Sequence, residues 1–170
     1  MSRGERAPAI RAAEQDDLDL LWEFVAIAGY EPSVAAARAV PFVAAHLAGW
    51  RRPQDFGFIA ECEGGAVGAA WARQFSPAEQ PAYYVNDNTP ELTIGVRREA
   101  RGRGVGELLL RATIAEAERR GVGLCLNVRH NNPARRLYER VGFRLVPGSG
   151  VPNRAGGLSF GMVLDGAPAG

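Results

Sequence analysis

The feature that most constrains the fold is a pair of alternating segments with a helical segment between them. Residues 91–96 alternate between apolar and polar or small side chains, and residues 124–128 repeat this period of two. The segment 105–120 between them has helical patterning and is followed by Gly121, a common helix stop. A strand, a helix and a strand joined this closely form a right-handed crossover, which makes the two strands parallel.

Other segments add antiparallel strands and more helices to this unit. Residues 56–62 and 66–73 are apolar runs joined by Glu63-Gly64-Gly65, which is typical of a tight hairpin because glycine accepts positive φ. The further expected elements are a strand at 9–13, a helix from Asp16 or Asp17, a helical stretch from Ser33 broken at Pro41, a long loop at 74–90, a short helix between Asn132 and Gly142, and a closing antiparallel pair at 143–146 and 158–164. The expected buried side of the helix at 105–120 consists of Leu108, Leu109, Ala112 and Ala115.

The chain shows no interior linker or repeat, and its 170 residues, 46% of them hydrophobic, suit one compact domain. We therefore expect a single domain over residues 1–170. The ends, 1–8 and 165–170, lack apolar periodicity, so we expect them to be frayed.

Composition excludes several classes of function. The 20 basic and 19 acidic residues leave a formal net charge of +1, which gives no global attraction to nucleic acid or to a membrane surface. Every basic residue is arginine, so Schiff-base, P-loop and general-base lysines are excluded. No stretch approaches the length of a membrane span, and Cys62 and Cys125 are too few for a disulfide scaffold. These features favour a cytoplasmic protein, in which both cysteines pack rather than react.

The connection Arg101-Gly102-Arg103-Gly104-Val105-Gly106 lies between the first strand of the crossover and the start of its helix. Its glycines let backbone N–H groups approach a ligand, and the helix dipole adds positive charge there, so the pattern indicates a phosphate site. It matches neither the dinucleotide fingerprint nor the P-loop. A surface turn and an RNA-binding loop are the alternatives.

A second motif follows the second strand of the crossover. It runs Asn131-Asn132-Pro133-Ala134-Arg135-Arg136-Leu137-Tyr138-Glu139-Arg140-Val141-Gly142-Phe143. Together with Arg101, Gly104 and Gly106, this motif resembles those of the GNAT superfamily of acyl-CoA-dependent N-acetyltransferases, through Asn131, Ala134, Leu137, Tyr138, Gly142 and Phe143. The resemblance is specific over 91–143, whereas residues 10–73 resemble the family only in their order of elements. It implies an α/β (α+β) fold with a mixed, mostly antiparallel sheet, a splayed parallel strand pair at 91–96 and 124–128, and helices on both faces.

The resemblance implies acetyl-CoA as co-substrate and no metal. The pantetheine arm would lie between the splayed strands and satisfy their backbone groups as an extra strand would. The implied cofactor-binding residues are Ile94, Gly95, Val96, Arg101, Gly102, Arg103, Gly104, Val105, Gly106, Asn131, Ala134 and Tyr138. The pyrophosphate would bind the N–H groups of 103–106. Asn131 would bind the arm through its amide, the alternative being a simple contact at a helix N-terminus.

The reaction implied is direct attack of a primary amine on the acetyl thioester in a ternary complex. An alkylamine with a pKa of about 10 must first lose a proton, so a base is required. Glu91 is the first candidate for this base, with Asp87 and water as alternatives. If Glu91 has no catalytic role, it is a solvated residue at the end of a strand. Tyr138 fills the family position of the acid that protonates the leaving thiolate, the alternative being packing alone. Backbone N–H groups near Ile94 and Val96 would stabilise the oxyanion.

The acceptor stays open among a small amine, an amino acid, an antibiotic and a protein amine. The aromatic residues Trp50, Trp71, Phe75, Tyr83 and Tyr84 either line an acceptor cleft or belong to the core. We expect His46 to be structural and His130 to be a solvated loop residue.

Two further functions remain as alternatives. A non-catalytic acyl-CoA-binding sensor would keep the phosphate site but would need neither Glu91 nor Tyr138. An arginine–glycine nucleic-acid module at 97–103 would bind in a salt-dependent way, and the balanced charge argues against it. The expected partners are acetyl-CoA and an amine-bearing small molecule or protein, with no nucleic acid and no membrane, and a homodimer is left open.

Overall fold

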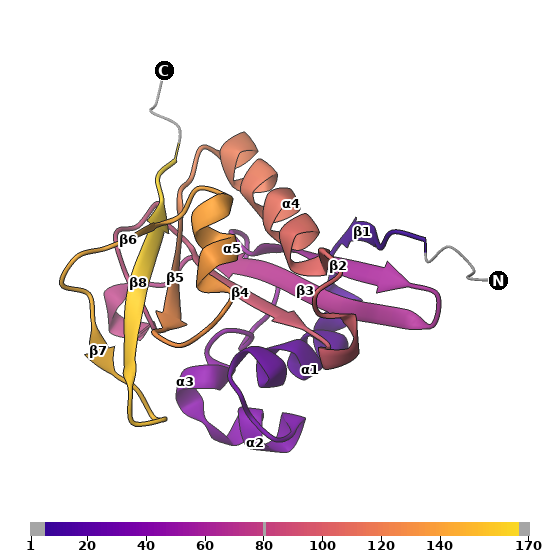
Figure 1. Ribbon diagram of the computed structural model, residues 1–170, viewed down its shortest axis with the longest axis horizontal. Coiled ribbons are helices and arrows are strands. Elements are labelled where there is room, and N and C mark those ends of the chain that lie inside the picture. The colour runs from indigo at the N-terminus through magenta and orange to yellow at the C-terminus, as the bar shows by residue number, and fades with distance from the viewer. Residues whose placement is uncertain (1–5, 80, 167–170) are drawn as a thin grey trace.

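The computed structural model describes residues 6–79 and 81–166. The expectation of frayed ends falls mainly on residues 1–5 and 167–170, which lie outside the described residues. Within them, the chain forms one sheet with helices on both of its faces (Figure 1).

The sheet is mixed and mostly antiparallel, as the sequence predicted. Its strands are β1 (Ala9–Ala12), β2 (Phe56–Cys62), β3 (Gly65–Arg73), β4 (Glu91–Val96), β5 (Leu124–Arg129), β6 (Arg144–Leu145), β7 (Val151–Pro152) and β8 (Leu158–Leu164). Their order is β1-β2-β3-β4-β5-β8-β6, and β7 pairs with β8. The hairpin of β2 and β3 turns through Gly64 and Gly65, whose φ values are 101° and 120°. Only glycine adopts such angles readily, which explains the local signal.

The parallel pair, β4 and β5, is splayed. Its register consists of the single pair Glu91 and Cys125 among the described residues, where the N–H of Cys125 donates to the carbonyl of Pro90 at 3.0 Å. By contrast, β4 pairs with β3 up to Val96, and β5 pairs with β8 up to Arg129. The two inner strands therefore meet at their first residues and then part.

The helices form two layers. On one face lie α1 (Leu18–Ala28), α2 (Val34–Ala39) and α3 (Pro41–Ala44), and on the other lie α4 (Val105–Arg120) and α5 (Arg135–Arg140) (Figure 1). Short 3-10 segments occupy Gln15–Asp17, Pro77–Glu79 and Arg98–Ala100. The predicted break at Pro41 is confirmed: Val40 is extended, and Pro41 begins α3, where a missing N–H costs nothing.

The buried side of α4 differs from the prediction. The helix buries Val105, Leu109, Leu110, Thr113 and Ala117, whereas Leu108 is 38% exposed and Ala115 is exposed. At 3.6 residues per turn, positions 105, 109 and 113 form one stripe that starts at the first helical residue. Leu109 was predicted correctly, but position 108 belongs to the neighbouring side, and the expected burial of Leu108 and Ala115 was wrong.

Strand β4 separates two apolar cores by its alternation. Leu92 belongs to the core beneath α4 and α5, while Gly95 faces α1, where an added Cβ would lie 2.5 Å from the carbonyl oxygen of Phe24. The absence of a side chain at Gly95 thus lets α1 approach β4. Because Glu91 is four residues from Gly95, its side chain points to the same face.

Candidate active site

The connection before α4 forms an open cradle. Residues 101–104 are exposed, and Gly102 and Gly104 have φ values of 74° and 80°. A Cβ added at either glycine would meet nothing within 4 Å. The first turn of α4 therefore directs its N–H groups toward free space, the arrangement that binds phosphate. The guanidinium of Arg101 donates to the carbonyl of Val96 at 3.2 Å, which ties the cradle to the end of β4.

Gly106 has a second role that the sequence did not indicate. It is half-buried, and an added Cβ would lie 3.3 Å from Cδ2 of Leu137. A larger residue here would press α5 away from α4 as well as occupy the cradle. Gly104 is therefore the cleaner position for testing ligand contact.

The edge of β4 that faces β5 is open beyond its first residue. Ile94 is in register with Ala70 of β3, and Val96 with Gly68. Strand β3 therefore covers only the edge of β4 that faces away from β5. Among the described residues no strand pairs with the opposite edge at these positions. Open edge groups of this kind are what an extended arm of a ligand hydrogen-bonds.

Asn131 does not serve as a helix contact. It is exposed, and the side chain that caps the turn before α5 is that of Asn132, whose Oδ1 accepts from the N–H of Ala134 at 2.9 Å. The alternative considered for Asn131 is therefore wrong. Ala134 is half-buried and packs against the core beneath α4 and α5.

Tyr138 extends from α5 into the same core, and only 7% of it is exposed. Its ring lies edge-on to Phe143, with centroids 6.1 Å apart. Burial, reinforced by the nearby Tyr30, raises the pKa of Tyr138. The hydroxyl has no hydrogen-bond partner among the described residues and stays protonated at neutral pH. It is therefore able to donate a proton.

Glu91 lies on the opposite face and is 4% exposed, so the solvated strand end considered for it is wrong. Its Oε1 lies 3.2 Å from Nε2 of His46, which follows α3. Its Oε2 is fully enclosed and has no hydrogen-bond partner within the described part of the chain. Such an oxygen is rare in folded proteins and indicates a place for a ligand.

His46 is the residue that sequence reasoning missed. Its Nδ1 lies 3.1 Å from the carbonyl of Phe42 and 3.3 Å from that of Val43. The rings of Phe42 and Phe75 contact it edge-on, at centroid distances of 5.8 and 5.3 Å. No local pattern gives this position, because Glu91 is distant in sequence and the fold alone brings the two together.

The other candidates have different surroundings. Asp87 is exposed and accepts a hydrogen bond from the hydroxyl of Tyr84. Cys125 is buried opposite Glu91, and burial, followed by the charge of Glu91, raises the pKa of its thiol. This thiol stays protonated, which suits packing rather than nucleophilic attack. His130 is exposed, with Nδ1 3.2 Å from the carbonyl of Leu158.

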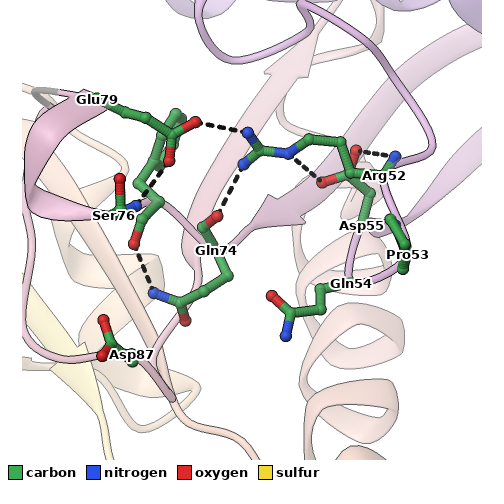
Figure 2. A pocket seen from close by; sticks show the side chains of 9 residues that line it. Arg52, Pro53, Gln54, Asp55, Gln74, Ser76, Glu79 and Asp87 are labelled. Carbon is green, nitrogen blue, oxygen red and sulfur yellow. Dashed lines mark hydrogen bonds and ion pairs between the residues drawn. The ribbon is translucent and has the colours of Figure 1, made fainter.

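A surface pocket of about 530 Å³ lies beside this site (Figure 2). Its lining consists of Arg52, Pro53, Gln54, Asp55, Gln74, Phe75, Ser76, Glu79 and Asp87. Figure 2 shows Arg52 already bound to the carboxylate of Glu79 and to the carbonyl of Gln74. Phe75 lines this pocket and its ring also contacts His46, the partner of Glu91.

The aromatic residues divide between core and surface. Trp50 and Trp71 are buried and pack edge-on, which places them in the core beneath α1–α3. The ring of Tyr83 covers Gly161 of β8, where an added Cβ would lie 2.3 Å from the ring. Among these aromatic residues, Phe75 is the one that both lines the pocket and contacts His46.

Similarity to known proteins agrees with this geometry. Residues 19–143 match the family described as the acetyltransferase (GNAT) family. Over 88 residues the chain is 34% identical to YwnH of Bacillus subtilis (strain 168), whose description as a phosphinothricin acetyltransferase is itself provisional. That alignment covers 51% of this chain and 52% of YwnH, so the chain spans about half the length of this curated relative.

Solved structures resemble the chain over nearly its whole length. The ribosomal-protein-alanine N-acetyltransferase from Brucella melitensis has a TM-score of 0.69 and 26% identity, over 92% of this chain and 99% of that one. The ribosomal-protein-S18-alanine N-acetyltransferase from Escherichia coli has a TM-score of 0.69 and 25% identity, over 96% of each chain. YncA from Salmonella typhimurium, a provisionally assigned acetyltransferase solved with its cofactor acetyl-CoA, shares the fold with a TM-score of 0.73 at 22% identity, over 96% of each chain.

None of the helices among the described residues is long and apolar enough to cross a membrane. The same residues contain no group of three or more His, Cys, Asp or Glu side chains that could hold a metal ion.

Proposed function

Because the chain belongs to the GNAT acetyltransferase family, we propose that it transfers the acetyl group of acetyl-CoA to a primary amine by direct attack in a ternary complex. The observation that carries this proposal is the parting of β4 and β5 after a single register pair, with a phosphate cradle at the end of β4. The described residues form one sheet with a core on each face, which supports a single catalytic domain.

The binding residues fit acetyl-CoA. In the proposal, the N–H groups of residues 103–106 hold the pyrophosphate at the open start of α4. The edge of β4 from Ile94 to Val96 that no strand covers hydrogen-bonds the pantetheine arm, beside Arg101 at the carbonyl of Val96, and the exposed amide of Asn131 binds the arm from the other side. The YncA structure, which contains acetyl-CoA in the same fold, supports this assignment.

Glu91 and Tyr138 divide the proton transfers between the two faces of the sheet. Oε2 of Glu91 takes a proton from the incoming ammonium, for which an enclosed carboxylate oxygen without a partner is well suited. Tyr138, still protonated because burial raises its pKa, gives a proton to the leaving thiolate. A sensor that only binds acyl-CoA needs no enclosed, unpartnered carboxylate, so Glu91 favours the enzyme over the sensor.

The test is a panel of primary amines assayed for acetyl-CoA-dependent thiol release, alongside calorimetric binding of acetyl-CoA. The panel includes phosphinothricin and a peptide with an N-terminal alanine, the acceptors named for relatives. Thiol release with any amine, and an acetylated product by mass spectrometry, is the expected result. Tight binding of acetyl-CoA with no product from any amine would replace the enzyme with the sensor, and absent binding would refute both.

A further inference from the structure

The contacts of His46 fix how many protons the buried pair holds. A carbonyl oxygen accepts hydrogen bonds and donates none, so Nδ1, which faces the carbonyls of Phe42 and Val43, carries a proton. Neutral His46 then has a lone pair on Nε2, directed at Oε1 of Glu91. Two lone pairs at 3.2 Å form no hydrogen bond, so one further proton lies between these two atoms. The pair is therefore either imidazolium with carboxylate or imidazole with carboxylic acid.

The surroundings leave this proton to Glu91 and His46 alone. On β3, the guanidinium of Arg73 is bound at 2.8 Å by the carboxylate of Asp55, so its charge is already matched. On β5, Cys125 stays a neutral thiol, and in the loop before β4 burial raises the pKa of Tyr83, which keeps it neutral as well.

The direction of the pKa shift of His46 favours the imidazolium form. Burial by itself lowers it, but the hydrogen bond and charge of Glu91, with the carbonyls of Val43 and Phe42, outweigh that effect and raise the pKa overall. The other charge nearby is that of Arg52, which lies over the far side of the Phe75 ring, 5.8 Å from its centroid.

We propose that His46 is a positioning residue that holds Glu91 as a carboxylate through Oε1 and leaves Oε2 to receive the proton of the amine. This inference rests on the proposed function, in which Glu91 is the base. The ammonium gives one proton to Oε2, and the nitrogen lone pair forms the C–N bond as the C–S bond breaks. Tyr138 gives its proton to the thiolate sulfur, and the second proton that the nitrogen loses passes through solvent to restore the Tyr138 hydroxyl. The proton on Glu91 is then released, so the products are an amide, free CoA and one proton.

The first experiment does not depend on activity. The imidazole rings of the protein are titrated by ¹⁵N NMR, in which His46 and His130 each give one pair of ring-nitrogen signals. In the parent protein, His46 is expected to remain imidazolium well above the ordinary value of about 6.5. In Glu91→Gln it is expected to become neutral at a pH at least one unit lower. A His46 ring that is neutral at pH 7 in the parent protein would overturn the proposal.

The second experiment separates positioning from structure. His46→Gln keeps an amide that can donate to Oε1 but carries no charge. Its acidic limb in the pH profile of kcat is expected to move upward by about one unit, so the loss is roughly 10-fold at pH values below the limb and disappears above it, with an unchanged KM for acetyl-CoA. A purely structural role would lower kcat by the same factor at every pH, which contradicts the proposal.

Failure of the proposed function has a different signature. If the parent protein acetylates an amine and Glu91→Gln is equally active, Glu91 is not the base and the positioning role falls with it, whatever the NMR titration shows. If His46→Gln does not fold, the parent and Glu91→Gln titrations still decide whether the charged pair exists.

Discussion

Glu91 and Arg73 are register partners on β4 and β3, yet their side chains form no ion pair with each other. The guanidinium of Arg73 binds the carbonyls of Ala45 and Ala48, which follow α3, and the carboxylate of Asp55, which precedes β2. The carboxylate of Glu91 contacts the imidazole of His46 instead. The permanent charge is thus bound elsewhere, and the carboxylate proposed as the base has a partner that can itself gain or lose a proton.

The buried ion pair of Arg73 and Asp55 gives a prediction on stability. Both side chains are 1% exposed, so Asp55→Asn leaves an enclosed guanidinium without its counter-charge. We expect the free energy of unfolding to fall by about 3–5 kcal/mol. Glu79→Gln, which breaks the part-exposed pair with Arg52, is the matched control and should cost below about 1 kcal/mol. Urea denaturation measures both, and equal losses would contradict the prediction.

The hydroxyl of Tyr138 can be removed without disturbing its ring. Tyr138→Phe keeps the edge contact with Phe143, so acetyl-CoA affinity should be unchanged. Turnover should fall about 10-fold to 100-fold, because the thiolate loses its proton donor. Calorimetry and steady-state kinetics measure the two quantities. Turnover at the parental level would reduce Tyr138 to a packing role.

Glu91 and Asp87 can be distinguished as bases by their amides. Glu91→Gln should lower the rate strongly at neutral pH and less at high pH, where more of the amine is already neutral. Asp87→Asn removes an exposed carboxylate that accepts from Tyr84 and should change the rate little. The pH profile of kcat/KM compares them, and the reverse ranking would transfer the base to Asp87.

The two ends of α4 offer matched glycines for testing the cradle. Gly104 and Gly121 have φ values of 80° and 70°, and an added Cβ would meet nothing within 4 Å at either. Alanine at each position should therefore cost a similar strain of about 1–2 kcal/mol. Only Gly104→Ala places its methyl group where the pyrophosphate is proposed to bind, and we expect its acetyl-CoA affinity to fall at least about 10-fold. Equal affinities by calorimetry would exclude the cradle as the phosphate site.

The raised pKa of His46 predicts how stability varies with pH. Glu91 raises it above the unfolded value of about 6.5, so the stabilisation by the pair is complete below that pH. It is lost as the pH rises through the folded-state pKa. The difference in unfolding free energy between the parent protein and Glu91→Gln should therefore shrink between pH 6.5 and higher pH. Urea titrations across this range measure it, and a constant difference would argue against the charged pair.

The sequence predicted the elements but not the environment of Glu91, the proposed base. Alternation over 91–96 and 124–128 and the glycines of the hairpin are local signals, and each gave the correct element. Alternation also placed Glu91 opposite Leu92 correctly. Its burial was missed because the cover comes from the residues after α3, a helix of four residues whose position depends on the whole α1–α3 layer. Leu108 and Ala115 of α4 were wrongly expected to be buried because the apolar residues spread around the helix, so only packing selects among them.

The splayed seam has a consequence for the folded chain itself. Strands β4 and β5 share one register pair, so the facing edges of the two strands are left for a ligand to bind. A ligand that binds only the folded chain adds to its stability by mass action, by about 2.7 kcal/mol at one hundred times its dissociation constant. The fraction of folded protein would then rise and fall with the concentration of acetyl-CoA. A low concentration would reduce the amount of folded protein as well as slow its reaction.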